Sequence, residues 1–392
     1  MREVRVGVVE GNLVLEEGSV VVPEGECIEV KGSVLCRGFC VFKGPLKAHS
    51  LRARGGDVEV EGSLTVDRSV EVRDGSLYVR GSLRAIRVRV DGSCEVEEVL
   101  EAESASVGGM LRAREVKAER VSVGSVLRAE RVRGGKLAVG GSVEVDEIEI
   151  EKASVGGTVR ARKAVIRDVL SAGGTVEIEE AEVGRLSVGG AAVLERGKAG
   201  RVSVGGTLEA RGPLEVERIS VGGSARMAEG FKGESVSVGG RLEIEGDAEV
   251  EERISVGGTL EARGTLRAGR VSVGGLAEVE KLVAEEVTVT SLRARKGVWA
   301  ETLDVSKRGR VEGLVVAEQV YMESGSYADK IYAKVFECEE RCRVRELYAE
   351  EAIIGDFSRV GSVRYSRELR TGRGVEIIAS EKVDAIEFPR DP

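Results

Sequence analysis

The chain of 392 residues contains few of the side chains that carry most enzyme chemistry. Its single histidine, His49, is the one candidate for a general base of the usual kind. It lies in the segment GPLKAHSLRAR, without a serine or cysteine in a recognisable catalytic arrangement, and we interpret it as a surface residue. The sequence therefore predicts that the protein is not an enzyme, with no catalytic, cofactor-binding or metal-binding residues and no cofactor.

Long apolar runs and aromatic residues are also scarce. No run approaches the roughly 18 apolar residues of a membrane-spanning helix, and the first residues, MREVRVGVVEG, lack the apolar core of a signal peptide. Aromatic residues make up 3% of the chain, and Phe231 is the single one between residues 100 and 298, too few for a long carbohydrate-binding groove. These absences predict a cytoplasmic protein.

Charged residues of both signs are abundant and interleaved. They make up 32% of the chain, and the net charge of −9 opposes nonspecific binding to nucleic acid or to an anionic membrane, so we expect neither as a partner. Asn12 and Gln319 are the only residues of their types. This composition is typical of a thermophile protein, although a repeat that copies its own bias would also produce it.

A short repeat dominates the middle of the chain. The tetrapeptide Ser-Val-Gly-Gly recurs every 16 to 18 residues if its near-copies SVGS, AVGG and SAGG are included. A fixed short period indicates stacked supersecondary units. Full copies begin at Ser106, Ser154, Ser187, Ser203, Ser220, Ser237, Ser255 and Ser272.

One repeat, residues 254–273, shows what each unit is. Apolar residues occur in pairs separated by one residue, which is the strand periodicity, and glycine-containing corners separate the pairs. Each repeat therefore predicts three short strands and three corners, which form one triangular coil. The fold class is all-β, a single long parallel β-solenoid (triangular β-helix) with 16–18 residues per coil and roughly 22 coils.

The repeat divides the chain by its regularity. We expect irregular coils over 1–100, regular coils over 101–290, aromatic-rich coils over 291–365, and an end cap or tail over 366–392, where Val375–Ile378 and Val383–Phe388 look like strands. The valines of the tetrapeptide are predicted to fill the core. One outward column is predicted to mix both charges: Arg112, Arg128, Glu144, Arg160, Glu177, Val193, Glu209, Arg226, Glu243, Glu261 and Glu278.

The six cysteines have three interpretations: buried free thiols, disulfides or metal ligands. Two pairs share the spacing Cys-x3-Cys but lie about 18 coils apart, roughly 85 Å on the stacking rise, so they cannot form one site. Zinc needs four ligands, and a disulfide in the cytoplasm is plausible mainly in a hyperthermophile. The cysteines are Cys27, Cys36, Cys40, Cys94, Cys338 and Cys342.

Aromatic residues concentrate in one part of the chain, since nine of the thirteen lie between Trp299 and Phe388. Exposed apolar stripes often mark interaction surfaces. The alternatives are aromatic stacking that stabilises the solenoid, or a stripe covered by the chain's own tail. A second candidate is the flat face of small residues on the tetrapeptide side. The predicted lateral or partner surface is Val283, Trp299, Val316, Tyr332 and Tyr348.

Segments such as GDVEVEGSLTV (56–66) and VRGSLRAIRVRVDGSCEVE (79–97), with their regular glycine corners, make the chain resemble the bactofilins over about residues 28–365. The resemblance implies a right-handed triangular solenoid that polymerises end to end without nucleotide, as a cytoskeletal protein. The chain is far longer than a usual bactofilin core.

Two functions follow as hypotheses. The first is a structural, filament-forming protein whose partner is itself, as a head-to-tail homopolymer that can also form lateral bundles, because solenoid ends expose unpaired backbone and core. The alternative is a monomeric scaffold that binds a protein or glycan through the aromatic stripe. The predicted polymerisation ends are Val4, Val6, Val8, Leu13, Val14, Ile377, Ile378, Ile386 and Phe388.

Overall fold

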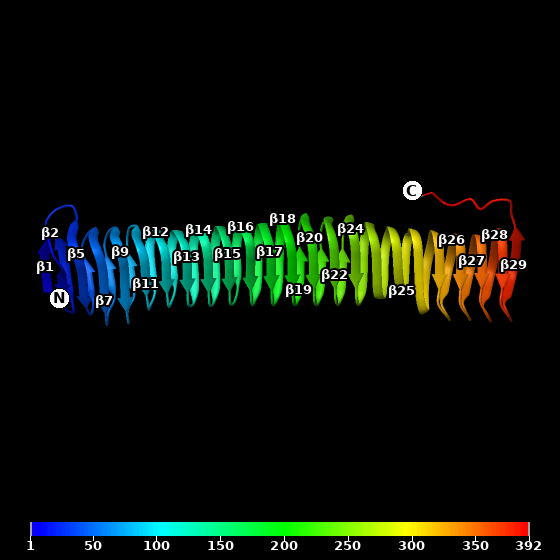
Figure 1. Cartoon of the computed structure of the whole chain (residues 1–392), viewed down its shortest axis with the longest axis horizontal. Coiled ribbons are helices and arrows are strands. Elements are labelled where there is room, and N and C mark those ends of the chain that lie inside the picture. The colour runs from blue at the N-terminus through cyan, green and yellow to red at the C-terminus, as the bar shows by residue number, and fades with distance from the viewer. Residues whose placement is uncertain (1, 391–392) are drawn as a thin grey trace. The chain divides into compact units, whose positions relative to one another are not determined.

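The computed structural model describes residues 2–390, which form strands and no helix. The chain divides into two compact units, residues 1–192 and 193–392. In both, successive strands pair in parallel as turns of a β-solenoid, with about 22 turns in all (Figure 1). The predicted fold class is therefore confirmed.

The first unit contains short strands over its first hundred residues and longer ones thereafter. These are β1 (Arg2–Val6), β2 (Val8–Val9), β3 (Leu13–Leu15), β4 (Ser19–Pro23), β5 (Ile28–Arg37), β6 (Cys40–Phe42), β7 (Leu46–Arg54), β8 (Val58–Val60), β9 (Leu64–Arg73), β10 (Leu77–Val79), β11 (Leu83–Val90), β12 (Cys94–Val107), β13 (Leu111–Val123), β14 (Val126–Val139), β15 (Ser142–Val155), β16 (Val159–Ala172) and β17 (Thr175–Val188).

The second unit follows the same plan. Its strands are β18 (Ala191–Val204), which begins just before the boundary, β19 (Thr207–Ala210), β20 (Leu214–Val221), β21 (Ser224–Met227), β22 (Phe231–Val238), β23 (Arg241–Ile244), β24 (Ala248–Val256), β25 (Thr259–Met322), β26 (Tyr327–Cys338), β27 (Arg343–Ile354), β28 (Arg359–Thr371) and β29 (Glu376–Lys382).

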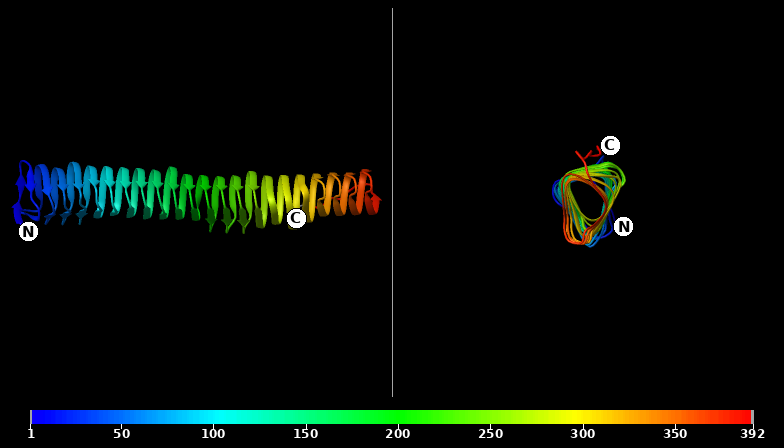
Figure 2. Two further views of the ribbon diagram at one scale, coloured as in Figure 1. Left: turned by 90° about the horizontal axis from the view of Figure 1, so that it is seen from below. Right: turned by 90° about the vertical axis from the view of Figure 1, so that its right-hand side faces the viewer.

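Each coil is triangular in cross-section (Figure 2). We call its three sides I, II and III in chain order. In β13 they are 111–113, 116–118 and 121–123, and these pair in register with 127–129, 132–134 and 137–139 of β14. Because the register repeats from coil to coil, each position of the repeat forms a column along the unit. The predicted outward column of mixed charge lies on side I.

The core lies inside the triangle and consists of apolar columns. Leu111, Val116 and Val121 of β13 are each at most 4% exposed, one from each side of the coil. The tetrapeptide valines are buried as predicted: Val107, Val123, Val139, Val155, Val188 and Val204. Burial of these columns is the main stabilising contribution, because no single coil can bury its apolar residues alone.

The stack extends beyond Tyr365, since β29 adds a further strand to β28. The expected strand at Val375–Ile378 is thus present, as part of β29. The expected strand at Val383–Phe388 is wrong, because the described residues after Lys382 form no strand. Ser380 and Lys382 occupy inward positions of β29, so the apolar column that would hold another strand ends there. Residues 391 and 392 of the predicted tail lie outside the described residues.

The core assignment predicts a large asymmetry between neighbouring residues of side III. Val204→Asp places a carboxylate among apolar side chains, and we expect it to lower the free energy of unfolding by at least about 3 kcal/mol. Ser203→Asp, at the exposed position beside it, is the control and should change stability little. Chemical denaturation of both variants measures the difference, and equal midpoints would contradict the assignment.

Candidate functional surfaces

Side II of the second unit carries a charge ladder that changes into an aromatic stripe. Lys198, Glu215, Lys232 and Glu249 are consecutive outward residues of this side, and they form ion pairs of 2.6 Å (Lys198–Glu215) and 3.1 Å (Lys232–Glu249). Farther along the same side the outward residues are apolar or aromatic, before charge returns at Arg364 and Glu381. The aromatic stripe is Val283, Trp299, Val316, Tyr332 and Tyr348.

The five residues of the aromatic stripe are half-buried, and each follows a fully buried core residue. The strand pairing aligns Val316, Tyr332 and Tyr348 in one column. The rings of Tyr332 and Tyr348 stack with centroids 4.3 Å apart and an interplanar angle of 4°. The structure therefore brings these predicted residues together on one side of the unit.

Cations lie over the rings of the aromatic stripe. Lys281 Nζ is 5.4 Å from the centroid of the Trp299 ring, and Lys330 Nζ is 5.5 and 5.2 Å from those of Tyr332 and Tyr348. Partial burial lowers the pKa of Lys330, but the hydrogen bond to Glu346 and the nearby charges raise it further, so the net pKa is raised and this lysine stays charged. Such contacts stabilise the rings by about 0.5–1 kcal/mol each at exposed sites.

The ring faces of the stripe are largely occupied by neighbours. Tyr332 and Tyr348 cover one face of each other, and Gly297 (φ 125°) would carry a Cβ 3.0 Å from the Trp299 ring, so the indole lies against the backbone there. The Trp299 Nε1 atom is buried without a hydrogen-bond partner. Ring edges and aliphatic groups are what remains for a partner to contact.

The predicted N-terminal end residues divide into two groups. Val4 and Leu13 are partly exposed and stack on Val21 and Val34, which are fully buried in the next coil. Val6 is 8% exposed and also points inward.

Val8 and Val14 instead point away from the triangle. They are 61% and 49% exposed and pair with the outward residues Glu29 and Leu35. The inward residues beside them are Val9 and Leu15, which the sequence analysis missed. A period-two count misses Val9, because Gly7 interrupts the alternation after Val6, but it would have found Leu15, which follows Leu13 at a spacing of two.

The predicted C-terminal end residues are also dispersed. Ile377 stacks on the buried Val360, whereas Ile378 is 88% exposed and points outward. Ile386 and Phe388 belong to the segment after Lys382, which Figure 2 shows outside the triangle of the last coils rather than across it. Of the four, Ile377 alone lies in an inward column of the last strand.

The tetrapeptide face on side III has a structural explanation. A Cβ added at Gly239 would lie 2.3 Å from the carbonyl oxygen of Gly222, and one at Gly222 would lie 2.5 Å from that of Gly205. At the first glycine of the tetrapeptide, successive coils approach too closely for a Cβ, so stacking itself requires glycine there, whereas the second position also accepts Ser125. The serines beside them are exposed or partly exposed.

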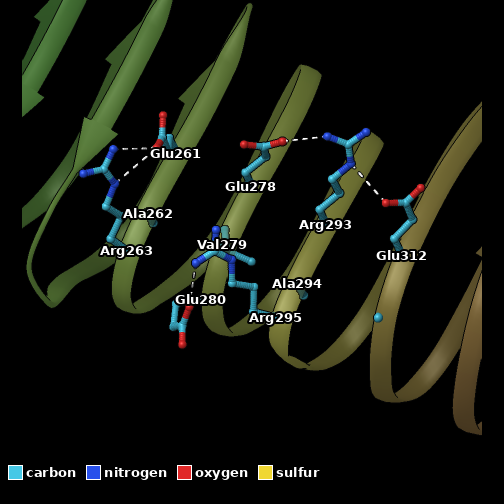
Figure 3. A pocket seen from close by; sticks show the side chains of 11 residues that line it. Glu261, Ala262, Arg263, Glu278, Val279, Glu280, Arg293, Ala294, Arg295 and Glu312 are labelled. Atoms are coloured by element: carbon cyan, nitrogen blue, oxygen red, sulfur yellow. Dashed lines mark hydrogen bonds and ion pairs between the residues drawn. The ribbon is translucent and has the colours of Figure 1, made fainter.

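Side I carries hollows and ladders of paired charges. A hollow of about 500 Å³ is lined by Glu261, Glu278, Arg293, Glu312 and their neighbours (Figure 3). Arg293 bridges Glu278 at 2.8 Å and Glu312 at 3.0 Å, and these carboxylates raise its pKa. The charges that line the hollow are thus neutralised by one another.

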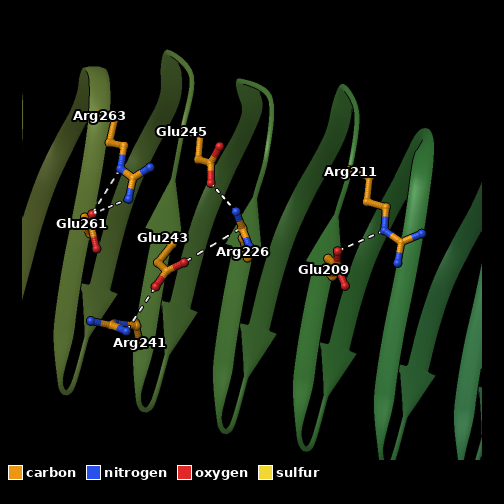
Figure 4. Close-up of polar contacts among 8 residues, drawn as sticks. All are labelled: Glu209, Arg211, Arg226, Arg241, Glu243, Glu245, Glu261 and Arg263. Carbon is orange, nitrogen blue, oxygen red and sulfur yellow. Dashed lines mark hydrogen bonds and ion pairs between the residues drawn. The ribbon is translucent and has the colours of Figure 1, made fainter.

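The neighbouring coils repeat this arrangement (Figure 4). Arg211 contacts Glu209 at 3.0 Å, and Arg226 contacts Glu243 at 4.0 Å. These side chains are mostly exposed, and such ion pairs stabilise a fold by between about 0 and 1 kcal/mol each. They therefore determine the charge pattern of the surface more than the stability of the fold.

Apart from the cysteine pairs, chemistry-bearing groups do not converge at any described site. His49 is exposed and lies 3.5 Å from Asp67. Within residues 2–390 no group of three or more histidine, cysteine, aspartate or glutamate residues could hold a metal ion. The six cysteines are free thiols, and Cys27 is the one that is not fully buried. In the same part of the chain, no helix is long and apolar enough to cross a membrane.

Comparison with known proteins does not extend these observations. No protein-family model matches the chain, and neither a curated protein nor a solved structure does.

The glycine corners generate a test of whether the tetrapeptide serves stacking. Gly239→Ala forces a Cβ against the Gly222 carbonyl, and we expect it to lower stability by about 1–3 kcal/mol. Gly11→Ala is the control, because no heavy atom outside its chain neighbours lies within 4 Å of the added Cβ. Equal denaturation midpoints for the two variants would refute the stacking requirement.

Proposed function

We propose that this protein is a structural, non-enzymatic protein that resembles the bactofilins in function, assembling end to end into filaments without a nucleotide. The parallel solenoid fold supports this, because strand edges at a terminal coil can pair with another chain. The sequence pattern that resembles the bactofilins supports it independently.

The observation that carries the proposal is the apolar N-terminal coil. Val4 and Leu13 remain partly exposed at positions whose counterparts in the next coil, Val21 and Val34, are fully buried. Val9 stands in the same relation to Val30. A second chain stacked on this coil would bury these residues and pair with the outer edges of β1, β2 and β3.

The C-terminal coil offers a different surface. Ile377 is its apolar contribution, but Ser380 and Lys382 stand above Val363 and Tyr365 in the inward columns of side II. A junction at this end therefore relies more on backbone pairing along β29 than on apolar burial. The N-terminal end supplies most of the apolar contact in the proposed filament.

The proposal predicts that a charge on the inward side of the first coil prevents assembly. Val4→Glu and Leu13→Glu should each abolish filaments, because the carboxylate would be desolvated at every junction, while the circular dichroism spectrum stays unchanged. Val8→Glu and Val14→Glu are matched controls on the same coil and should assemble normally. Negative-stain microscopy and sedimentation measure the result.

The C-terminal end has its own matched pair. Ile377→Glu should also abolish filaments, whereas Ile378→Glu, at the outward neighbour, should not. Wild-type protein that stays monomeric at high concentration would refute end-to-end assembly. Assembly that stops at dimers and ignores Ile377→Glu would show that the N-terminal end alone associates, and the filament function would be wrong.

A second function, a scaffold that binds a partner, is favoured by the aromatic stripe. On side II a ladder of ion pairs gives way to apolar and aromatic residues, an exchange that the core does not require. The occupied ring faces support a protein partner over a glycan, because sugars stack on open faces.

The triple variant Trp299→Ser, Tyr332→Ser, Tyr348→Ser tests whether the aromatic stripe serves association or stabilises the fold. If the stripe serves association, we expect the circular dichroism spectrum to remain nearly unchanged while lateral or partner contacts are lost. A matched triple serine variant on the same side, at Lys198, Lys232 and Arg267, controls for general loss of surface side chains. Unfolding of the aromatic variant alone would show that the stripe is structural.

A further inference from the structure

The two Cys-x3-Cys pairs occupy the same place in the coil, one in each compact unit. Cys36 ends side III in β5, and Cys40 begins side I in β6. Cys338 ends side III in β26, and Cys342 follows the same kind of three-residue corner. Each pair therefore faces one interior corner of its triangle from two adjacent sides.

The thiols of each pair are buried and close enough for each to shift the pKa of the other. Cys36, Cys40, Cys338 and Cys342 are at most 3% exposed. The chain turns the corner between Cys36 and Cys40 with a positive φ at Gly38 (87°). It turns the corner between Cys338 and Cys342 with a positive φ at Arg341 (58°). All four cysteine side chains point inward, as their burial shows.

Each pair is also polarised in the same direction. The hydrogen bond from Cys338 lowers the pKa of Cys342 to about 7, with help from Ser326 and against the effect of burial. The hydrogen bond from Cys36 likewise lowers the pKa of Cys40. The partners Cys36 and Cys338 have raised pKa values, because each donates that hydrogen bond and is buried. In each pair the lowered pKa therefore favours the thiolate, which is the reactive form, at Cys40 and at Cys342 rather than at their partners.

We propose that each pair is an oxidative modification site at which a small hydroperoxide closes an intrachain disulfide, Cys36–Cys40 in one unit and Cys338–Cys342 in the other. This inference does not depend on the proposed function. The disulfide would link two adjacent sides of one coil across their shared corner, and it would form on oxidation and break on reduction.

The chemistry balances for hydrogen peroxide as the oxidant. The Cys342 thiolate attacks one peroxide oxygen, the O–O bond breaks, and the released hydroxide takes up a proton to become water, leaving a sulfenic acid. The Cys338 sulfur then attacks the Cys342 sulfur, the S–O bond breaks, and a second water leaves. Overall, two thiols are oxidised to one disulfide and one peroxide is reduced to two waters. Cys36 and Cys40 follow the same course.

The chain contains its own control. Cys94 lies in the same inward column as Cys40 and is 1% exposed, but Val90 stands across its corner in place of a second thiol. Burial raises the pKa of Cys94 to about 12. Burial alone therefore does not define a site, and Cys94 should stay reduced where the pairs react.

The experiment uses the full chain with Cys27→Ser, which removes the one thiol that is not fully buried. The protein is treated with hydrogen peroxide while folded, quenched, unfolded, and alkylated with iodoacetamide. Trypsin cuts after Arg37 and after Arg341, inside both Cys-x3-Cys segments. A disulfide therefore appears as two tryptic peptides that remain joined until a reductant is added.

We expect both joined peptide pairs, with alkylation confined to Cys94. Cys338→Ser should lose the second linkage and keep the first, and Cys36→Ser the reverse. Pairs that stay fully alkylated after oxidation would overturn the proposal. So would linkages that involve Cys94, or linkages between chains.

Hydrogen exchange tests what closure does. The amides of Gly38 and Arg341 donate to the carbonyls of Arg54 and Asp356 in the next coils, both at 2.8 Å. A closed disulfide should slow the exchange of these two amides, and a reductant should restore the original rate. Unchanged exchange in protein whose disulfides are shown to be closed would refute the stabilising role.

Discussion

Close backbone approach between successive coils is the constraint on which this structure depends. The Gly239 amide donates to the Val221 carbonyl at 2.9 Å, and a Cβ added at Gly239 would lie 2.3 Å from the carbonyl oxygen of Gly222. That contact fixes the length of each turn, holds every position in a column, and places core, charge and aromatic residues on fixed sides. It also means that a terminal coil presents hydrogen-bonding edges, from which the proposed assembly follows.

Stacking made most of the fold predictable from the sequence. A returning tetrapeptide and paired apolar residues were enough to place Val204 in the core and Arg226 on the outside, because a column repeats one physical environment. Local chain direction was not predictable where the period fails. Val8 points outward because the strand is interrupted at Gly7 and the alternation starts again after it, whereas Val14 is the regular outward neighbour of Leu13 and Leu15. The departure after Lys382 depends on inward polar residues whose position needed the register.

The surfaces differ in how much they inform function. On sides I and II most charged residues form ion pairs, which leaves little free charge for a ligand. The places where these columns of ion pairs are interrupted are therefore the more informative ones. The aromatic stripe is one such deviation, and the apolar first coil is another. The aromatic stripe is partly covered by its own ring stacking and by Lys281 and Lys330. Within the described residues, nothing comparable covers Val4 and Leu13 on the side that faces away from the next coil. For this reason we rank end-to-end assembly above partner binding.

The register of neighbouring strands has a consequence for synthesis. Pairing partners such as Leu111 and Leu127 lie a single coil apart in the sequence, so each turn needs the turn before it as a template and little else. Contacts of such short sequence separation close small loops and form early. Successive coils can therefore add to a growing stack while the ribosome is still extending the chain, with each new turn covering the apolar edge left by its predecessor.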